Sequence, residues 1–402
     1  MSKRYQGGIL GVGFNPLRAP NAPTIGTATG GNASATVPFT APACVGGSAI
    51  TGYTGRSNPG NVAATASASP LTFSGLTNCT AYTFGVFALN SYGPSPISAF
   101  SNSVTPAPDG TFAIFALGRD ACFGRTTARN KYTYAGDVVS AGGASTAASY
   151  AGSAAGNGTV GIFALGSGPG GASTTRNKYT YVGCVVSAGG AATATSLYGA
   201  AAGNSTTGIF ALGQVCGIGN STTRNKYTYS GCVVAAGGAS TQGSSRGSAA
   251  GTSTVGIFAI GLGCCNARTS TRDKYTYSSD AVTSATSAST TNYSGSAAGN
   301  STFGIFALGV TLSFTPSTTR NKYTYSGDVN SAGGAATAAS YEGSAAGSST
   351  IGIFQLGFVS CAVSTTRNKY TYSGCVVSAA TAATAATVAS SAASNGTTGV
   401  NM

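Results

Sequence analysis

The chain has 402 residues and a formal net charge of +13, but charged residues make up only 7% of it. This length predicts at least two structural units. With no histidine and only seven carboxylates, the composition argues against a histidine-based catalytic triad and against a glycosidase with paired acids. No metal ligand set or cofactor site is expected, because the ten cysteines show no paired C-x-x-C spacing. The sequence therefore predicts a protein that is not an enzyme.

Residues 1–19 are rich in glycine and carry Lys3, Arg4 and Arg18. They lack the apolar run of a secretory signal, and no stretch of the chain resembles a membrane-spanning helix, so membrane insertion is not expected. By itself such a segment should be flexible, and we interpret it as an anchoring arm that docks on another protein.

Residues 20–107 contain short runs that alternate in polarity, such as Ala35 to Phe39, and these predict strands. The run from Gly75 to Phe84 places Leu76 and Tyr82 as they occur at the corner of a fibronectin type III domain. The segment resembles such a domain, and the resemblance implies a β-sandwich. The turns that hold Cys44 and Cys79 would then lie at opposite ends of the sandwich, so we expect intermolecular links or free thiols at these two positions.

Residues 108–402 contain a strong internal repeat with a spacing of 47 or 48 residues. One motif, Arg-Asn-Lys-Tyr-Thr-Tyr or a close variant, alternates as a strand does. Another, Gly-Ile-Phe-Ala-Leu-Gly or a close variant, precedes it in each unit. The six copies of the first motif begin at Arg129, Arg176, Arg224, Arg272, Arg320 and Arg367. About four short strands per unit are typical of a propeller blade.

The first unit begins directly at its phenylalanine strand, whereas the last unit runs on into a copy of the strand that the first one lacks. The C-terminal strand is therefore predicted to complete the first unit and to hide the open sheet edges. The order of motifs resembles the kelch repeat. Together with the N-terminal segment, this resemblance implies an all-β chain: a fibronectin type III-like β-sandwich followed by a six-bladed β-propeller closed by the C-terminal strand.

The cysteines of the repeat occupy two kinds of position, one after the tyrosine motif and one in the loop after the phenylalanine strand. A cysteine of the first kind is followed by a loop cysteine in the next unit, so three disulfides between adjacent units are predicted; the alternative is scattered buried thiols. The predicted pairs are Cys184 with Cys216, Cys232 with Cys264 or Cys265, and Cys375 with Cys122. Cys361 breaks the rule and is a candidate free or intermolecular thiol.

The arginines that begin the six tyrosine motifs are the best candidates for a cationic site. They either bridge adjacent units or bind carbonyl groups, or they form with the six lysines of the motif a ring that holds an anionic polysaccharide or a lipopolysaccharide phosphate. The loops after the phenylalanine strands vary most, and variable loops often carry recognition. Their apolar residues are candidates for a ligand rim: Phe123, Val215, Ile218, Phe314 and Phe358.

These features favour a structural component of a bacteriophage particle, either a fibre, a tail protein or a capsid decoration, that displays the propeller for surface or glycan recognition. The repeat and the fibronectin-like segment also look similar to proteins of environmental phages. We expect partners among the other virion proteins, contacted through the arm and the fibronectin-like domain, in a homo-oligomeric assembly. A host surface glycan is a candidate ligand. Nucleic acid is not expected as a ligand, because the basic residues are distributed evenly among the repeats. The alternative is a bacterial adhesin of the cell surface or extracellular matrix.

Overall fold

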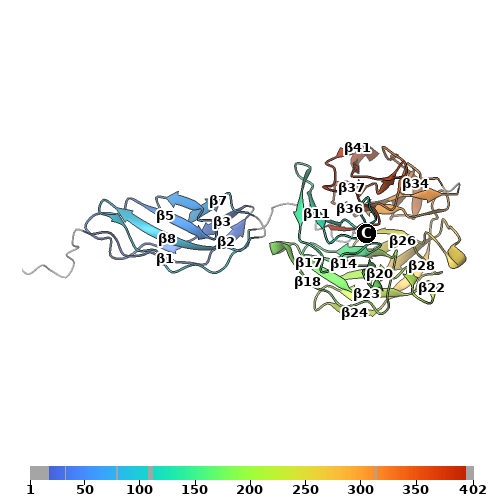
Figure 1. The fold of residues 1–402 in the computed structure, drawn as a ribbon, viewed down its shortest axis with the longest axis horizontal. Helices are drawn as coiled ribbons and strands as arrows, with labels where there is room; N and C mark the ends of the chain where they lie inside the picture. Colours follow the sequence, from blue (N-terminus) through green and yellow to red (C-terminus); the bar gives the residue numbers. More distant parts are fainter. Residues whose placement is uncertain (1–17, 32, 78–79, 107–111, 313–314, 395–402) are drawn as a thin grey trace, which may run out of the picture. The chain divides into compact units, whose positions relative to one another are not determined.

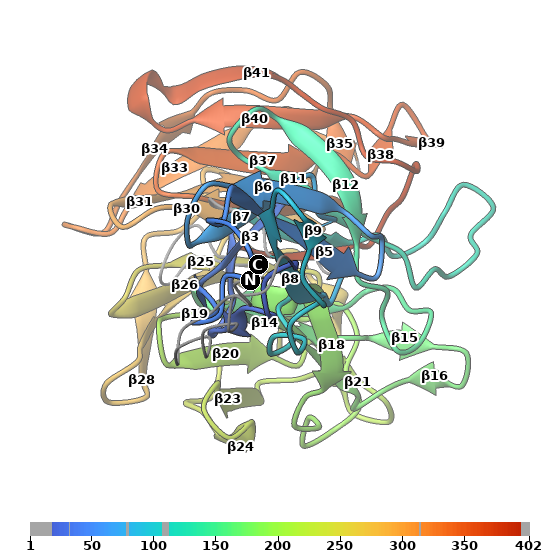
Figure 2. The same ribbon diagram turned by 90° about the vertical axis from the view of Figure 1, so that its left-hand side faces the viewer.

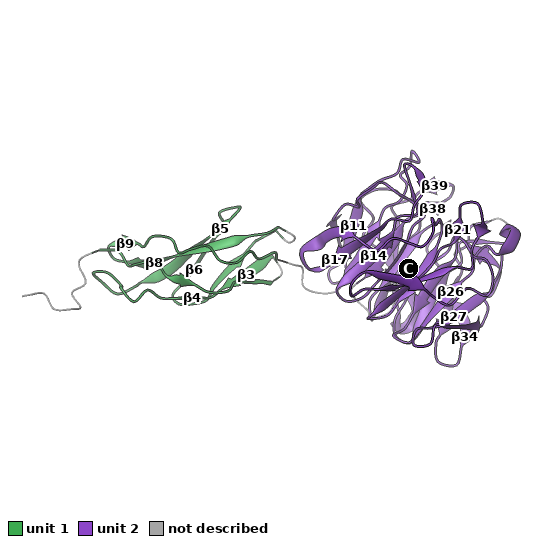
Figure 3. Ribbon diagram, turned by 90° about the horizontal axis from the view of Figure 1, so that it is seen from below, with its two compact units in different colours: residues 1–109 green, residues 110–402 purple. Residues whose placement is uncertain are grey.

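The computed structural model describes residues 18–31, 33–77, 80–106, 112–312 and 315–394. The all-β class expected from the sequence is confirmed, since 51% of the chain lies in strands and 2% in helical turns. The helical turns are three short 3₁₀ segments, Val182–Cys184, Cys264–Asn266 and Ser373–Cys375. The chain divides into two compact units, Met1–Asp109 and Gly110–Met402 (Figure 3).

The first unit is built from three antiparallel sheets that enclose one apolar core. One sheet has the order β2-β3-β7, another β6-β5-β8-β9, and β1 pairs with β4. Alternate residues of β3 and β7 are buried, and these side chains pack against those of β8, among them Phe73 and Phe84 with ring centroids 4.5 Å apart. The strands are β1 (Thr24–Ile25), β2 (Thr29–Gly31), β3 (Ser34–Val37), β4 (Phe39–Thr40), β5 (Gly52–Asn58), β6 (Ala63–Ala66), β7 (Leu71–Ser74), β8 (Thr83–Asn90) and β9 (Gly93–Pro94).

A buried tyrosine holds the turn between β7 and β8. The hydroxyl oxygen of Tyr82 accepts a hydrogen bond of 3.1 Å from the backbone N–H of Thr77. Leu76 and Tyr82 are both buried in the core of this unit. The tyrosine thus fixes the path of the chain between the two sheets.

The second unit contains six four-stranded antiparallel sheets within its described residues (Figure 1). Five have an innermost strand rich in alanine: β13 (Ser153–Gly156), β19 (Ala200–Gly203), β25 (Ser248–Gly251), β30 (Ser296–Gly299) and β36 (Ser344–Gly347). The phenylalanine motif forms the second strand: β10 (Phe112–Ala116), β14 (Val160–Ala164), β20 (Thr207–Ala211), β26 (Val255–Ala259), β31 (Phe303–Ala307) and β37 (Ile351–Gln355).

The tyrosine motif forms the third strand of every sheet: β11 (Arg129–Thr133), β17 (Arg176–Thr180), β23 (Arg224–Thr228), β27 (Arg272–Thr276), β33 (Arg320–Thr324) and β40 (Arg367–Thr371). The outer edge strands are β12 (Val138–Gly142), β18 (Val185–Ala188), β24 (Val233–Ala236), β28 (Ala281–Ala285), β34 (Val329–Gly333) and β41 (Val376–Ala380). Figure 2 shows three of these outer strands, β24, β28 and β41, at the outside of the unit. Short hairpins, such as β21 (Gln214–Val215) with β22 (Gly219–Asn220), extend the loops between the second and third strands.

The C-terminal strand β42 (Ser391–Ser394) belongs to the sheet of the first repeat. It pairs antiparallel with β10, with Phe115 opposite Ala392, so the pairing expected from the sequence is present. Each innermost strand contacts the next one, from β13 through β36, and β42 contacts both β36 and β13. The six innermost strands therefore follow one another in a cycle.

The core of the second unit lies between adjacent sheets, where side chains of one sheet pack against the next. In the seam between the first two sheets, Phe112 and Ile114 pack with Phe163, Tyr179 and Tyr181. Gly161 approaches its neighbours so closely that a Cβ atom there would lie 2.8 Å from the hydroxyl oxygen of Tyr181. The repeat therefore uses glycine at this position to admit the tyrosine between the sheets.

Candidate functional site: the axial mouth

A layer of six buried arginines joins each repeat to the next. Each arginine donates a hydrogen bond of 2.7–3.1 Å from Nη2 to a side-chain oxygen of the next repeat. The acceptor is the asparagine or aspartate at the second position of the tyrosine motif, and Arg367 closes the cycle on Asn130. Each guanidinium carbon also lies 4.5–4.7 Å from the ring centroid of a phenylalanine of the next sheet. The layer comprises Arg129, Arg176, Arg224, Arg272, Arg320 and Arg367, all at most 2% exposed.

Burial has an electrostatic consequence for this layer. It lowers the pKa of Arg129, for example, to about 10, because the charged guanidinium loses its water. A solvent-borne polysaccharide has no access to these side chains. Of the two roles considered from the sequence, the structure therefore favours the bridging of adjacent units.

The turn after each tyrosine motif carries an aspartate or a cysteine in the left-handed conformation, with φ of 53–56°. Tyr275 donates its hydroxyl proton to Asp280 over 2.6 Å, and Lys226 of the preceding sheet forms an ion pair with the same carboxylate. The six members are Asp137, Cys184, Cys232, Asp280, Asp328 and Cys375. The aspartate at this position therefore links its own sheet to the preceding one.

The disulfides expected between adjacent units are absent from the structure. Cys122, Cys216, Cys232, Cys264, Cys265, Cys361 and Cys375 are free thiols, which excludes all three predicted pairs. The reason is the strand direction: Cys216 precedes β23, whereas Cys232 follows it, so the two kinds of position lie at opposite ends of the third strand. Because all sheets share this arrangement, a cysteine of one kind and a cysteine of the other kind in adjacent sheets lie at opposite ends of the sheets. A disulfide needs Cα atoms within about 7 Å, so these pairs cannot form.

The N-terminal thiols have a different setting. Arg18 donates a hydrogen bond of 3.4 Å to the sulfur of Cys44. The backbone N–H of Gly46 and this arginine lower the pKa of Cys44. Cys79 lies outside the described residues, so an intermolecular role for either cysteine stays a prediction.

A closed ring of backbone hydrogen bonds surrounds the axis of the second unit. The N–H of each member donates to the carbonyl oxygen of the previous member over 2.7–2.9 Å, and Ala151 completes the ring by donating to Ala389. All six members adopt the left-handed conformation, with φ of 49–56°. The members are Ala151, Tyr198, Arg246, Ser294, Glu342 and Ala389. With the residue that follows each of them, they line an open depression, which we call the axial mouth.

Three side chains of the axial mouth form a connected group. Arg246 Nη1 forms an ion pair of 2.6 Å with Glu342 Oε1, and its guanidinium carbon lies 3.9 Å from the ring centroid of Tyr198. The charged pair is partly exposed, at 28% and 17%. Burial raises the pKa of Tyr198, and Arg246 partly opposes that shift, so the phenol stays protonated at neutral pH. The mouth therefore offers an aromatic ring, a donor and an acceptor within one depression.

The same end of the sheets carries the loops predicted as a ligand rim. Phe123 and Ile218 are exposed there, at 62% and 75%. Phe358 stacks on Tyr341 with ring centroids 4.9 Å apart, and it lies 6.4 Å from Phe123. Val215 does not fit the prediction, because it is buried in a small cluster with Leu212. Phe314 lies outside the described residues.

Sequence reasoning missed Tyr198, Arg246 and Glu342, but the sequence held a signal for them. Each precedes the nearly constant Gly-Ser-Ala-Ala-Gly motif or its variant, at a position whose residue type changes from unit to unit. A variable residue next to constant ones indicates a side chain that the scaffold does not need.

Within the described residues, no group of three or more histidine, cysteine, aspartate or glutamate side chains is placed to hold a metal ion. The same residues contain no helix long and apolar enough to cross a membrane. A comparison with known protein families finds no match to this chain, and neither does one with curated proteins.

Proposed function

We propose that this chain is a non-enzymatic recognition protein whose axial mouth binds a surface glycan. In this proposal the second unit is a six-bladed, kelch-like β-propeller closed by its C-terminal strand, and the first is a fibronectin type III-like spacer. The cyclic contacts of β13 to β42 and the closed layer of arginines support the propeller. The hydrogen bond to Tyr82 supports the spacer, because the tyrosine corner of immunoglobulin-like sandwiches has this form.

The observation that supports this function is the contrast between the repeated residues of the sheets and the varied residues of the axial mouth. Arginine, phenylalanine and tyrosine positions repeat around the cycle, whereas the six members of the backbone ring in the axial mouth comprise five different residue types. An aromatic ring beside a paired guanidinium and carboxylate suits a sugar, because the ring packs on the apolar face of a pyranose and the pair serves its hydroxyl groups. Among the described carboxylates, Glu342 alone lines the mouth, which supports binding without hydrolysis.

Glycan-array binding of the full chain tests this proposal. Tyr198→Asn removes the aromatic ring but keeps a residue that tolerates the left-handed conformation, and Glu342→Gln removes the acceptor charge. Each variant is expected to lose binding by about tenfold or more, because both groups lie at the centre of the site. Tyr92→Ala, an exposed tyrosine of the first unit, is the matched control and should bind normally. Unchanged binding in both mouth variants would remove the mouth from the proposal.

We further propose that the protein is carried on a bacteriophage particle as a fibre, tail or decoration component. A spacer joined to a recognition unit suits a protein that presents a binding surface on a particle. Mass spectrometry of purified particles tests this location. Consistent absence of the protein from the particles would exclude the proposed location.

A further inference from the structure

The first repeat places two arginines beside the axial mouth. The position of Arg125 also holds an arginine in the fourth repeat, Arg268 over Tyr293, whereas the position of Arg119 is charged in the first repeat alone. Arg119 follows the left-handed Gly118; in the other repeats the same position holds Ser167, Gln214, Leu262, Val310 and Phe358. Arg119 pairs with Arg125 across the loop, and its backbone exchanges hydrogen bonds of 3.0 Å and 2.9 Å with Val388. The last repeat therefore fixes the position of Arg119 in the first.

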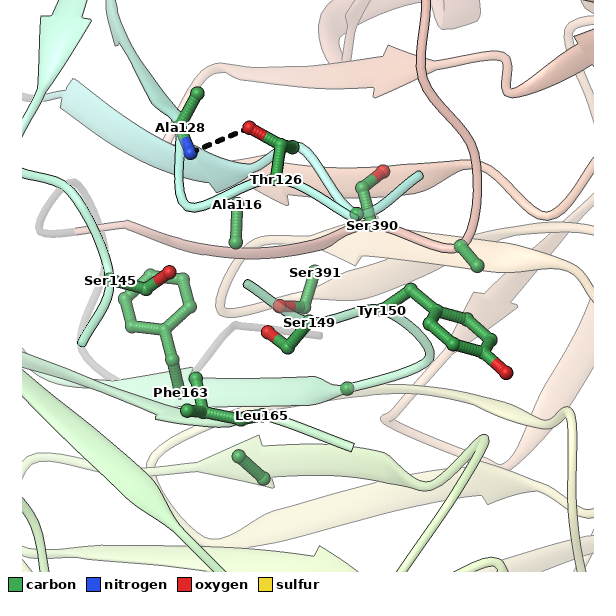
Figure 4. Close-up of a pocket in the computed structure, with 14 residues that line it drawn as sticks. Ala116, Thr126, Ala128, Ser145, Ser149, Tyr150, Phe163, Leu165, Ser390 and Ser391 are labelled. Carbon is green, nitrogen blue, oxygen red and sulfur yellow. Dashed lines mark hydrogen bonds between the residues drawn. The ribbon is translucent and has the colours of Figure 1, made fainter. Parts of the chain in front are cut away.

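Both guanidinium groups are directed at one tyrosine. The guanidinium carbon of Arg119 lies 3.4 Å from the ring centroid of Tyr150, and that of Arg125 lies 5.4 Å from it. Figure 4 shows the ring of Tyr150 projecting away from Phe163. The rings of Tyr150 and Tyr198 are 6.5 Å apart, so this group adjoins the axial mouth.

Neither arginine has a counter-charge in the part of the chain that the structure describes. The three ion pairs found there involve Arg224, Lys226 and Arg246. Asp120 is the neighbouring acid, but its carboxylate accepts the backbone N–H groups of Cys122 and Gly124 within its own turn. In addition, the Nε atom of Arg119 is enclosed and has no hydrogen-bond partner.

Like charges placed opposite each other on paired chains are destabilising, and an enclosed N–H without an acceptor adds to that cost. An anion bound between the two guanidinium groups would offset the repulsion between them. We propose that Arg119, Arg125 and Tyr150 form an anion subsite that reads the acidic group of the glycan, a carboxylate or a sulfate ester. This inference rests on the proposed function, because the acidic sugar would adjoin the one held at Tyr198.

Direct binding of short oligosaccharides to the full chain tests the subsite. The probes are tetrasaccharides of galacturonic acid, of a sulfated galactan and of neutral galactan, measured at fixed ionic strength. Either acidic probe is expected to bind about tenfold more tightly than the neutral one, because a charged hydrogen bond is stronger than a neutral one. The two acidic probes distinguish a carboxylate ligand from a sulfate ligand.

Arg119→Gln and Arg125→Gln should abolish the preference for acidic probes and leave neutral binding unchanged. Arg56→Gln removes a cation from the first unit and should not alter the preference, which separates the subsite from the general positive charge of the chain. Equal binding of acidic and neutral probes, or a preference that persists in both variants, overturns the subsite while the proposed function stands. Failure of every probe to bind the unmodified chain overturns both.

Discussion

Asp273 occupies the acceptor position that asparagine holds in the other five seams. It forms a buried ion pair of 2.7 Å with Arg224, and both side chains are at most 1% exposed. Its carboxylate also accepts hydrogen bonds from Ser240 and from the backbone and hydroxyl of Thr241. Burying both charges is costly, and these extra donors are what makes the pair tolerable.

Two substitutions at this residue should therefore differ in effect. Asp273→Asn recreates the seam found elsewhere in the ring and should change the free energy of unfolding by about 1–2 kcal/mol or less. Asp273→Ala leaves Arg224 buried without its counter-charge and should cost about 3–5 kcal/mol. Urea denaturation followed by far-UV circular dichroism measures both. Equal losses for the two variants would contradict this account of the seam.

At the scale of elements, β42 has the largest structural role for its length. It covers the edge of β10 and contacts the innermost strands on both sides, β36 and β13. The hydroxyl of Tyr134 donates to Ser394 over 3.1 Å, and Ala393 packs in the seam with Phe112 and Tyr181. Without this strand, the first sheet would expose an edge and an apolar seam to solvent.

Truncation after Ser390 removes β42 and is expected to lower the melting temperature by roughly 10 °C or more and to promote aggregation. Truncation after Ser394 keeps every residue of β42 and is the matched control. Calorimetry and gel filtration of the two truncated chains make the comparison. A melting temperature that is the same in both would show that the strand does not hold the cycle together.

At the scale of the whole molecule, stability should depend on alkaline pH much more than on acid. Burial raises the pKa of most tyrosines that line the seams, including Tyr132, Tyr134, Tyr181, Tyr229, Tyr277 and Tyr372. A raised pKa means that the native chain keeps a proton that the unfolded chain releases near pH 10. The stability from these groups is therefore complete below pH 10 and is lost as the pH rises above it.

The buried arginines act in the opposite direction. Their lowered pKa means that the unfolded chain binds more protons above pH 10, so the arginines add stability as the pH rises through that range. Because the shifted tyrosines outnumber them, the tyrosines should dominate. The melting temperature is expected to vary little from pH 5 to 9 and to fall by roughly 10 °C between pH 9 and 11.

Calorimetry at several pH values, with tyrosinate absorbance recorded in parallel, measures this dependence. The buried tyrosines should ionise together with unfolding. If all the tyrosines ionised gradually near pH 10 while the circular dichroism spectrum stayed that of the native protein, this prediction would be wrong.

The sequence predicted the repeating strands of the second unit and their order along the chain. The repeat spacing, the alternation of the tyrosine motif and the copied strand at the C-terminus are local patterns, because strand formation depends on residues next to one another in the chain. For the same reason, the partner of the edge strand β10 could be deduced from the copy alone. The bridging of adjacent units by the arginines was one of two roles that the sequence left open. The motif shows that a cation is present, but it does not show which face of the sheet is buried against the next sheet.

Side-chain positions of different repeats that meet across the cycle could not be predicted from the sequence. The predicted disulfides failed because the order of cysteines along the chain does not reveal at which end of a strand each one lies. The axial mouth was missed because Tyr198 and Arg246 lie one repeat apart in sequence, and Arg246 and Glu342 lie two repeats apart. The ring of backbone hydrogen bonds brings them together. Contacts across a cycle depend on the curvature of the whole array, and no window of one repeat contains that information.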